Sequence, residues 1–170
     1  VILDPFSLRS LGPECELLPL HPDSWREQLN ESPPHALLVE SAWTGPSGEW
    51  AGKVERAPEL LRAIVASCRH AGIPTIFWNK EDPLHFDAFI ETAALFDQVF
   101  TTDANSVGRY RRFLGHDRVG VMPFALQPRS HHPVRDRAPE PGSVFAGAWY
   151  GRFHDRCHDF HFVAAGLTAA

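Results

Sequence analysis

Seven polar residues of this 170-residue chain come directly after apolar runs, at the points where predicted strands end: Asp4, Glu40, Ser41, Asn79, Lys80, Glu81 and Asp103. Carboxylates exchange protons with hydroxyl groups, and a lysine ammonium stabilises negative charge that develops during a reaction. Glu40, Lys80 and Glu81 are therefore the candidate catalytic groups. The other polar residues near them are candidates for binding a substrate, and the residues after Met122, which follow a further predicted strand, belong to the same candidate site.

The segment at residues 73–83, Ile-Pro-Thr-Ile-Phe-Trp-Asn-Lys-Glu-Asp-Pro, indicates how such groups would be positioned. Its residues 75–78 are β-branched or aromatic, which predicts a strand covered on both faces. Asp82 stands where a helix N-cap belongs, with Pro83 at the first helical position and apolar residues at helical spacing behind it. Residues 79–81 are then left on a strand-to-helix turn. In open α/β sheets ligands bind outside the carboxyl ends of the strands, so we expect a site on this turn.

The same alternation of apolar runs and helical stripes recurs along the chain. Further strands are predicted at residues 1–3, 14–20, 35–40, 98–101, 119–122 and 144–147. Helices are predicted after Asp23, over 58–70, after Pro83, and from Asp103 or Asn105 to Gly115, whereas residues 5–13 are expected to be a loop. This order predicts an α/β fold, a Rossmann-like, mainly parallel sheet with helices on both faces.

The predicted domain organisation follows from composition. Residues 1–134 are expected to form one Rossmann-like domain, and the proline-rich residues 135–142 are expected to form a linker. Residues 143–170 are expected to be the start of a truncated second domain or a tail, with poor strand and helix signals after Gly151.

Composition and charge exclude several classes of function. A net charge of −5 gives no electrostatic reason to expect a nucleic-acid partner. No apolar run approaches the length of a membrane span, so we expect none. The three scattered cysteines, Cys15, Cys68 and Cys157, argue against a disulfide framework and favour a cytoplasmic location. We expect Cys68 to be a small core residue on a helical stripe.

Several candidate residues also have ordinary structural interpretations. Asp82 and Asp103 are each placed to cap a helix, and Lys80 with Glu81 can form a local ion pair near a helix N-terminus. The loop at residues 43–53, with Trp43 and a second tryptophan, is either a binding lip or a rigid surface loop packed on its own rings.

Metal binding is the last candidate activity. The spacing of His154, Cys157, His158 and His161 would place three zinc-type ligands on one side of a helix. Because no core is predicted around them, we expect an incidental cluster and no bound metal.

The order of motifs resembles one family, the glycosyltransferases related to the spore maturation protein CgeB, which belong to the two-domain GT-B class. The most distinctive matching piece is Trp-Asn-Lys-Glu-Asp-Pro at residues 78–83. The other matching pieces are Pro13-Glu14-Cys15, Trp25-Arg26-Glu27, Glu40-Ser41-Ala42-Trp43, Gly48-Glu49-Trp50, Phe96-Asp97, Phe100-Thr101-Thr102-Asp103, Gly115-His116-Asp117-Arg118-Val119, Pro123-Phe124-Ala125, Gln127-Pro128-Arg129 and Phe145-Ala146-Gly147.

The resemblance implies transfer of a sugar from a nucleotide-sugar donor to a small-molecule or glycan acceptor, without a metal or other cofactor. Glu40 and Glu81 would then be candidate bases for the acceptor hydroxyl, and Lys80 the cation facing the departing phosphate. The substrate-binding residues would be Ser41, Trp43, Trp78, Asn79, Asp82 and Asp103.

The sequence also departs from the family pattern. The donor nucleotide in such enzymes lies chiefly on a second domain, and Phe145-Ala146-Gly147 resembles its first strand, about twenty residues before Ala170. We therefore expect the chain to be inactive or incomplete without that half, as an isolated acceptor-side domain, a truncated gene product or half of an assembly. A homo-oligomer is among the partners considered. The alternative function is a non-catalytic module of the same fold that binds a sugar or nucleotide, or regulates.

Overall fold

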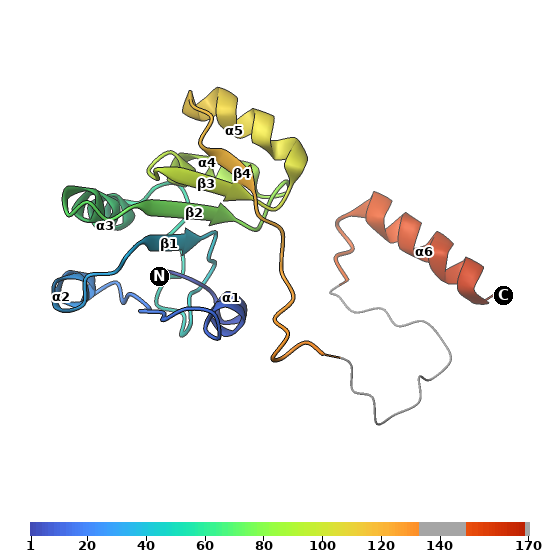
Figure 1. Cartoon of the computed structure of the whole chain (residues 1–170). Coiled ribbons are helices and arrows are strands. Elements are labelled where there is room, and N and C mark those ends of the chain that lie inside the picture. Colours follow the sequence, from blue (N-terminus) through green and yellow to red (C-terminus); the bar gives the residue numbers. More distant parts are fainter. Residues whose placement is uncertain (133–148, 169–170) are drawn as a thin grey trace. The chain divides into compact units, whose positions relative to one another are not determined.

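The structure is a computed structural model that describes residues 1–132 and 149–168. The chain divides into two compact units, Val1–His132 and Pro133–Ala170, and each is described by itself (Figure 1). The predicted linker at 135–142, the strand at 144–147 and the boundary at 134 lie outside the described residues.

The first unit is built on a four-stranded, all-parallel sheet (Figure 1). Its strands are β1 (Leu37–Glu40), β2 (Thr75–Asn79), β3 (Gln98–Thr101) and β4 (Val119–Val121), and their order in the sheet follows their order in the chain. An isolated parallel bridge between Ile2 and Val39 extends the sheet at the β1 edge. The predicted α/β class and parallel sheet are confirmed. Residues 14–20, predicted to be extended, form no strand.

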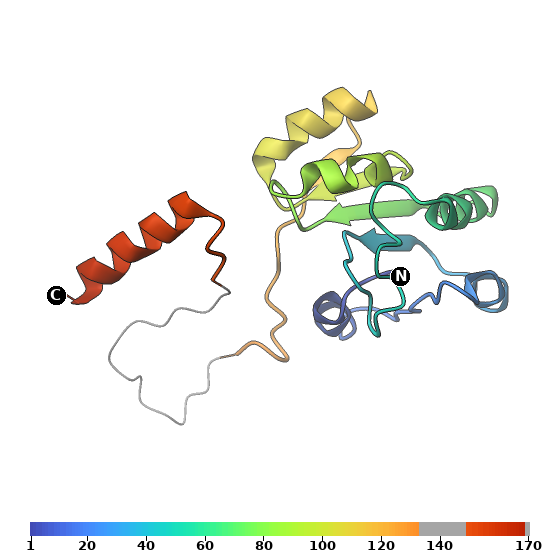
Figure 2. The ribbon, with the colours of Figure 1, turned by 180° about the vertical axis from the view of Figure 1, so that it is seen from behind.

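The strands are connected by helices (Figure 2). The helices of the first unit are α1 (Pro5–Leu11), α2 (Trp25–Glu31), α3 (Glu59–His70), α4 (Phe86–Ala93), the short 3₁₀ helix η1 (Ala104–Ser106) and α5 (Val107–Leu114). Gly115 ends α5 in the left-handed conformation at φ 71°, which glycine adopts without strain.

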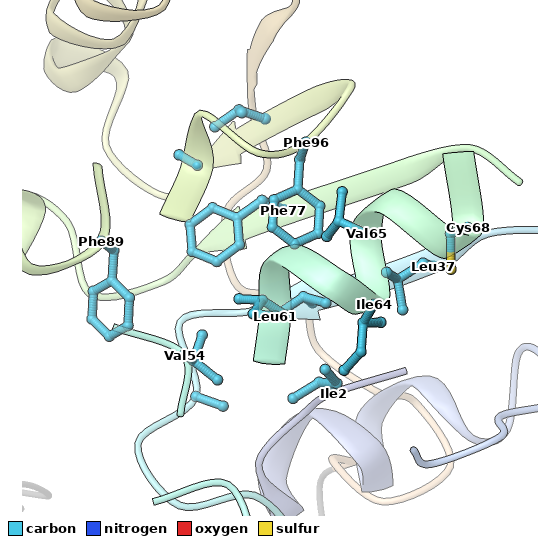
Figure 3. Packing of buried hydrophobic residues seen from close by; sticks show 14 of the residues in the cluster. Ile2, Leu37, Val54, Leu61, Ile64, Val65, Cys68, Phe77, Phe89 and Phe96 are labelled. Carbon is cyan, nitrogen blue, oxygen red and sulfur yellow. The ribbon is translucent and has the colours of Figure 1, made fainter. Parts of the chain in front are cut away.

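The main core lies between one face of the sheet and helices α3 to α5. Alternate strand residues enter it, among them Leu37, Phe77 and Val99. On α3 the stripe of Leu61, Ile64, Val65 and Cys68 is buried against them, as Figure 3 shows. Cys68 is fully buried, so its predicted role as a core residue is confirmed.

The opposite face of the sheet is covered less completely. Leu38, Ile76 and Phe100, which alternate with the core residues, are half-buried. Trp78 is buried on this side, where its ring packs against Phe124 with centroids 5.7 Å apart.

Two predictions about helices are wrong. Residues 5–13, expected to be a loop, contain α1, which begins after Asp4 with Pro5 at its first position. Asp82 does not cap α4, because this helix begins at Phe86 and His85 is its N-cap. Local capping preference is overridden at Asp82 by hydrogen bonds to the neighbouring strand, described below.

The described part of the second unit contains α6 (His154–Thr168). The segment after Gly151, whose strand and helix signals are poor, therefore contains a helix. The apolar residues of this helix do not form one stripe, and periodicity is the signal on which the prediction depended.

Candidate functional site

A buried ion cluster joins the carboxyl ends of β1 and β2. The Lys80 ammonium lies 2.8 Å from Glu40 Oε1 and 3.4 Å from Asp4 Oδ2. The side chain of Glu40 is fully buried, and that of Lys80 is 9% exposed. The register pairs Glu40 with Trp78, which brings Lys80 within reach. The polar residues after Val39 and after Trp78 thus lie together, and Glu40 and Lys80 form an ion pair with each other.

Asp4 completes this cluster from the start of α1. Its backbone N–H donates to Glu40 Oε1, and its carboxylate accepts hydrogen bonds from the amides of Gly45 (2.8 Å), Trp43 (3.3 Å) and Thr44 (3.3 Å). Burial alone raises the pKa of Asp4, but the Gly45 amide, the Lys80 charge and the other two amides together hold it below its ordinary value. The ionised Asp4 carboxylate therefore fixes the loop that starts at residue 43.

A second polar cluster lies where β2 and β3 end. The Asn79 side-chain amide donates to Asp82 Oδ1 (2.9 Å) and to the Tyr110 hydroxyl oxygen (2.8 Å), and the Thr101 hydroxyl donates to Asp82 Oδ2 (2.6 Å). Burial raises the pKa of Asp82, and hydrogen bonds from Thr101 and Tyr110 offset this only in part. The pKa of the Tyr110 hydroxyl is raised by burial and by the Asp82 charge.

Glu81 differs from the other acidic residues of this edge. Its backbone N–H donates to Asn79 Oδ1 (3.0 Å), which fixes the turn, while its side chain is half-buried. Within residues 1–132 no hydrogen bond or ion pair holds the Glu81 carboxylate, and Lys80 is paired elsewhere. Of the two predicted bases, Glu81 is therefore the one whose carboxylate has no partner within residues 1–132.

Three further predicted binding residues, Ser41, Asp103 and Trp43, contact different parts of the structure. The Ser41 hydroxyl accepts from the Lys80 N–H (3.0 Å). Asp103 accepts from the Asn105 amide (3.1 Å) and the Ser106 hydroxyl (2.7 Å), so its predicted capping role is confirmed at η1. Trp43, 36% exposed, packs edge-on against His85 with centroids 5.1 Å apart.

The two tryptophans of the loop at residues 43–53 differ in burial. Trp50 is fully buried in the core, and its Nε1–H donates to the Leu20 carbonyl (2.8 Å). Trp43, the other tryptophan of this loop, is 36% exposed and lies beside the carboxyl edge of the sheet. The loop is thus anchored by one tryptophan and presents the other.

A cavity of about 370 Å³ lies on the Trp78 side of the sheet, between α1 and residues 122–128. Of the predicted binding residues, only Trp78 lines it. The residues after Met122 were expected at the site, and they form one wall of the cavity. Sequence reasoning missed the other wall because it placed a loop at α1. The pair Asp4-Pro5, a capping residue followed by proline, was a signal that could have revealed this helix.

No group of three or more His, Cys, Asp or Glu side chains in residues 1–132 and 149–168 is arranged to hold a metal ion. Within those same ranges, none of the helices combines the length and apolarity that a membrane span requires.

We compared the chain with models of known families, with curated proteins and with solved structures. None of them matches significantly.

Proposed function

We propose that the Val1–His132 unit is the acceptor-side domain of a glycosyltransferase that uses a nucleotide-sugar donor. The observation that carries the proposal is the meeting of polar groups from β1, β2 and β3 at one carboxyl edge of a parallel sheet. This edge is where open α/β folds bind their ligands. The order of motifs, which resembles the CgeB-related glycosyltransferases, supplies the reaction class.

In this proposal Glu81 is the general base. Its carboxylate takes the proton of the acceptor hydroxyl as the hydroxyl oxygen bonds to the anomeric carbon and the bond from that carbon to the phosphate oxygen breaks. The nucleoside diphosphate leaves. Asn79 holds the Glu81 turn through its side-chain oxygen. Glu40, Lys80 and Asp4 form a buried support that keeps the β1 and β2 ends together.

The test measures release of nucleoside diphosphate from a panel of nucleotide sugars, with simple saccharides as acceptors, by the full 170-residue chain. A general base typically contributes about 10²–10⁴-fold in rate, so Glu81→Gln should lower release by at least about 100-fold. Glu91→Gln, an exposed carboxylate on α4, is the matched control and should keep the parent rate. Equal rates for the two variants overturn the role of Glu81, and no release by the parent favours the non-catalytic module described next.

A non-catalytic module is the second candidate. This candidate is favoured because the Lys80 ammonium forms ion pairs with two carboxylates and is therefore not available to bind a phosphate. Such a module should give binding heat with a nucleotide or sugar in calorimetry and no turnover. In either case we expect the chain to be cytoplasmic, since all three of its cysteines are free.

A further inference from the structure

The cavity on the Trp78 side of the sheet has aromatic walls. Trp78 is fixed by a hydrogen bond from its Nε1–H to the Met122 carbonyl (2.8 Å). Phe124 meets Trp78 edge-on, and Phe6 of α1 meets Phe124 edge-on with centroids 6.0 Å apart. Phe6 and Phe124 are 42% and 53% exposed, so their rings are open to a ligand. Flat apolar molecules are held well by such walls.

This cavity also has an unused polar group. Ser7 lines it and is 1% exposed, yet its hydroxyl has no hydrogen-bond partner in the part of the chain that the structure describes. Buried hydroxyls are nearly always paired, and pairing by a ligand would remove this exception. The Gln127 side chain, unlike the Ser7 hydroxyl, already has partners, because its amide donates to the Ser10 carbonyl (2.8 Å) and to Glu14 (3.0 Å). Gln127 therefore holds the wall in place.

A second cavity of about 360 Å³ adjoins the first, since Phe6 and Ser10 line both. Arg9, Arg129 and His131 line this second cavity. Among residues 1–132 neither arginine forms an ion pair, and both are exposed. Unpaired arginines with their planar fork of donors suit phosphate and carboxylate groups.

We propose that the two cavities together bind a small amphipathic anion. Its flat apolar or aromatic body lies between Phe6, Trp78 and Phe124, a polar group on that body pairs with the Ser7 hydroxyl, and its phosphate or carboxylate lies against Arg9 and Arg129. The site is separate from the Glu81 turn, and it does not depend on the proposed transfer reaction.

The probes are phenyl phosphate, 4-hydroxyphenyl phosphate and inorganic phosphate, titrated into the full chain by calorimetry. The two aryl phosphates should bind at least about tenfold more tightly than inorganic phosphate, because only they enter the aromatic cavity. The 4-hydroxyl should strengthen binding further. Equal affinity for inorganic and aryl phosphates, or no binding of any probe, overturns the proposal.

Variants locate the binding. Arg9→Gln and Arg129→Gln should each weaken phenyl phosphate by about tenfold, whereas Arg112→Gln, an exposed arginine on α5, is the matched control for lost charge. Ser7→Ala should abolish the preference for 4-hydroxyphenyl phosphate and leave phenyl phosphate unchanged. Equal affinities in the Arg9, Arg129 and Arg112 variants, or a preference that survives in Ser7→Ala, contradict the site. Glu81→Gln should bind as the parent does, so failure of the glycosyltransferase proposal would leave this one standing.

Discussion

Replacing Lys80 by methionine is expected to destabilise the first unit strongly. The Lys80 side chain is 9% exposed, and it neutralises a fully buried Glu40 carboxylate at 2.8 Å. Removing one partner of a buried ion pair leaves an uncompensated charge and typically costs about 3–5 kcal/mol. The Asp4 N–H still donates to Glu40 Oε1 in this variant, so we expect the lower end, about 3 kcal/mol in the free energy of unfolding.

The double variant Glu40→Gln with Lys80→Met separates charge from packing. It removes both charges, and replacing a whole buried pair is often close to neutral, so it should recover most of the lost free energy. Lys53→Met is the matched control, because Lys53 is the other lysine of the chain, and among the described residues its ammonium donates to the Glu49 carbonyl alone. We expect it to change the free energy of unfolding by less than about 1 kcal/mol.

Urea unfolding followed by tryptophan fluorescence measures all three variants, and an unchanged urea dependence shows that the denatured state is comparable. A loss below about 1 kcal/mol in Lys80→Met would refute the closed cluster, since a surface pair is worth no more than that. A double variant as unstable as Lys80→Met would also refute it. If the cluster is closed, lost ligand binding in a Lys80 variant reports unfolding and says little about catalysis.

Three further predictions rest on single features. Asp4→Asn should be less stable than the parent at pH 7, and the difference should shrink in urea titrations as the pH falls below 3.8, because a carboxyl whose pKa is lowered by folding loses its contribution as it is protonated. Gly115→Ala should lower the free energy of unfolding by about 1 kcal/mol, since alanine is strained at φ 71°. Cys15, which is exposed, should react quickly with a thiol reagent in the native chain, whereas Cys68 should react only on unfolding because it is buried and its thiol pKa is raised; equal rates for the two thiols would contradict its burial.

Short sequence patterns predicted β3 and the end of α5 correctly. The bounds of β3 and the end of α5 at Gly115 match the prediction, because a β-branched run and a C-terminal glycine determine them within a few residues. The side of the sheet on which polar groups gather was also predictable, since all carboxyl ends of a parallel sheet share one edge.

Features that depend on distant residues were not predictable. Asp82 has a capping signal, yet its carboxylate accepts from Thr101, nineteen residues away on the next strand. The burial of Glu40 and Lys80 depends on Asp4, and on the loop at 43–45 that the Asp4 carboxylate holds by hydrogen bonds. One wall of the cavity on the Trp78 side depends on the Gln127 hydrogen bond to the Ser10 carbonyl, across 117 residues of sequence. No spacing rule reaches over such distances.

The two proposed sites differ in charge: the Glu81 turn is acidic, whereas the second cavity is lined by arginines. The turn that carries Glu81 also carries Asp82, and Lys80 beside it is neutralised by two carboxylates, so this turn offers little attraction to an anion. Arg9 and Arg129, by contrast, are free of carboxylate partners in the described part of the unit. We therefore expect a phosphate-bearing molecule to prefer the second cavity, with Arg9 and Arg129, and a neutral hydroxyl compound to bind near Glu81 without electrostatic repulsion. If the chain transfers sugars, the acceptor belongs at the turn, and the cation needed by the departing phosphate has to come from outside the Lys80 cluster.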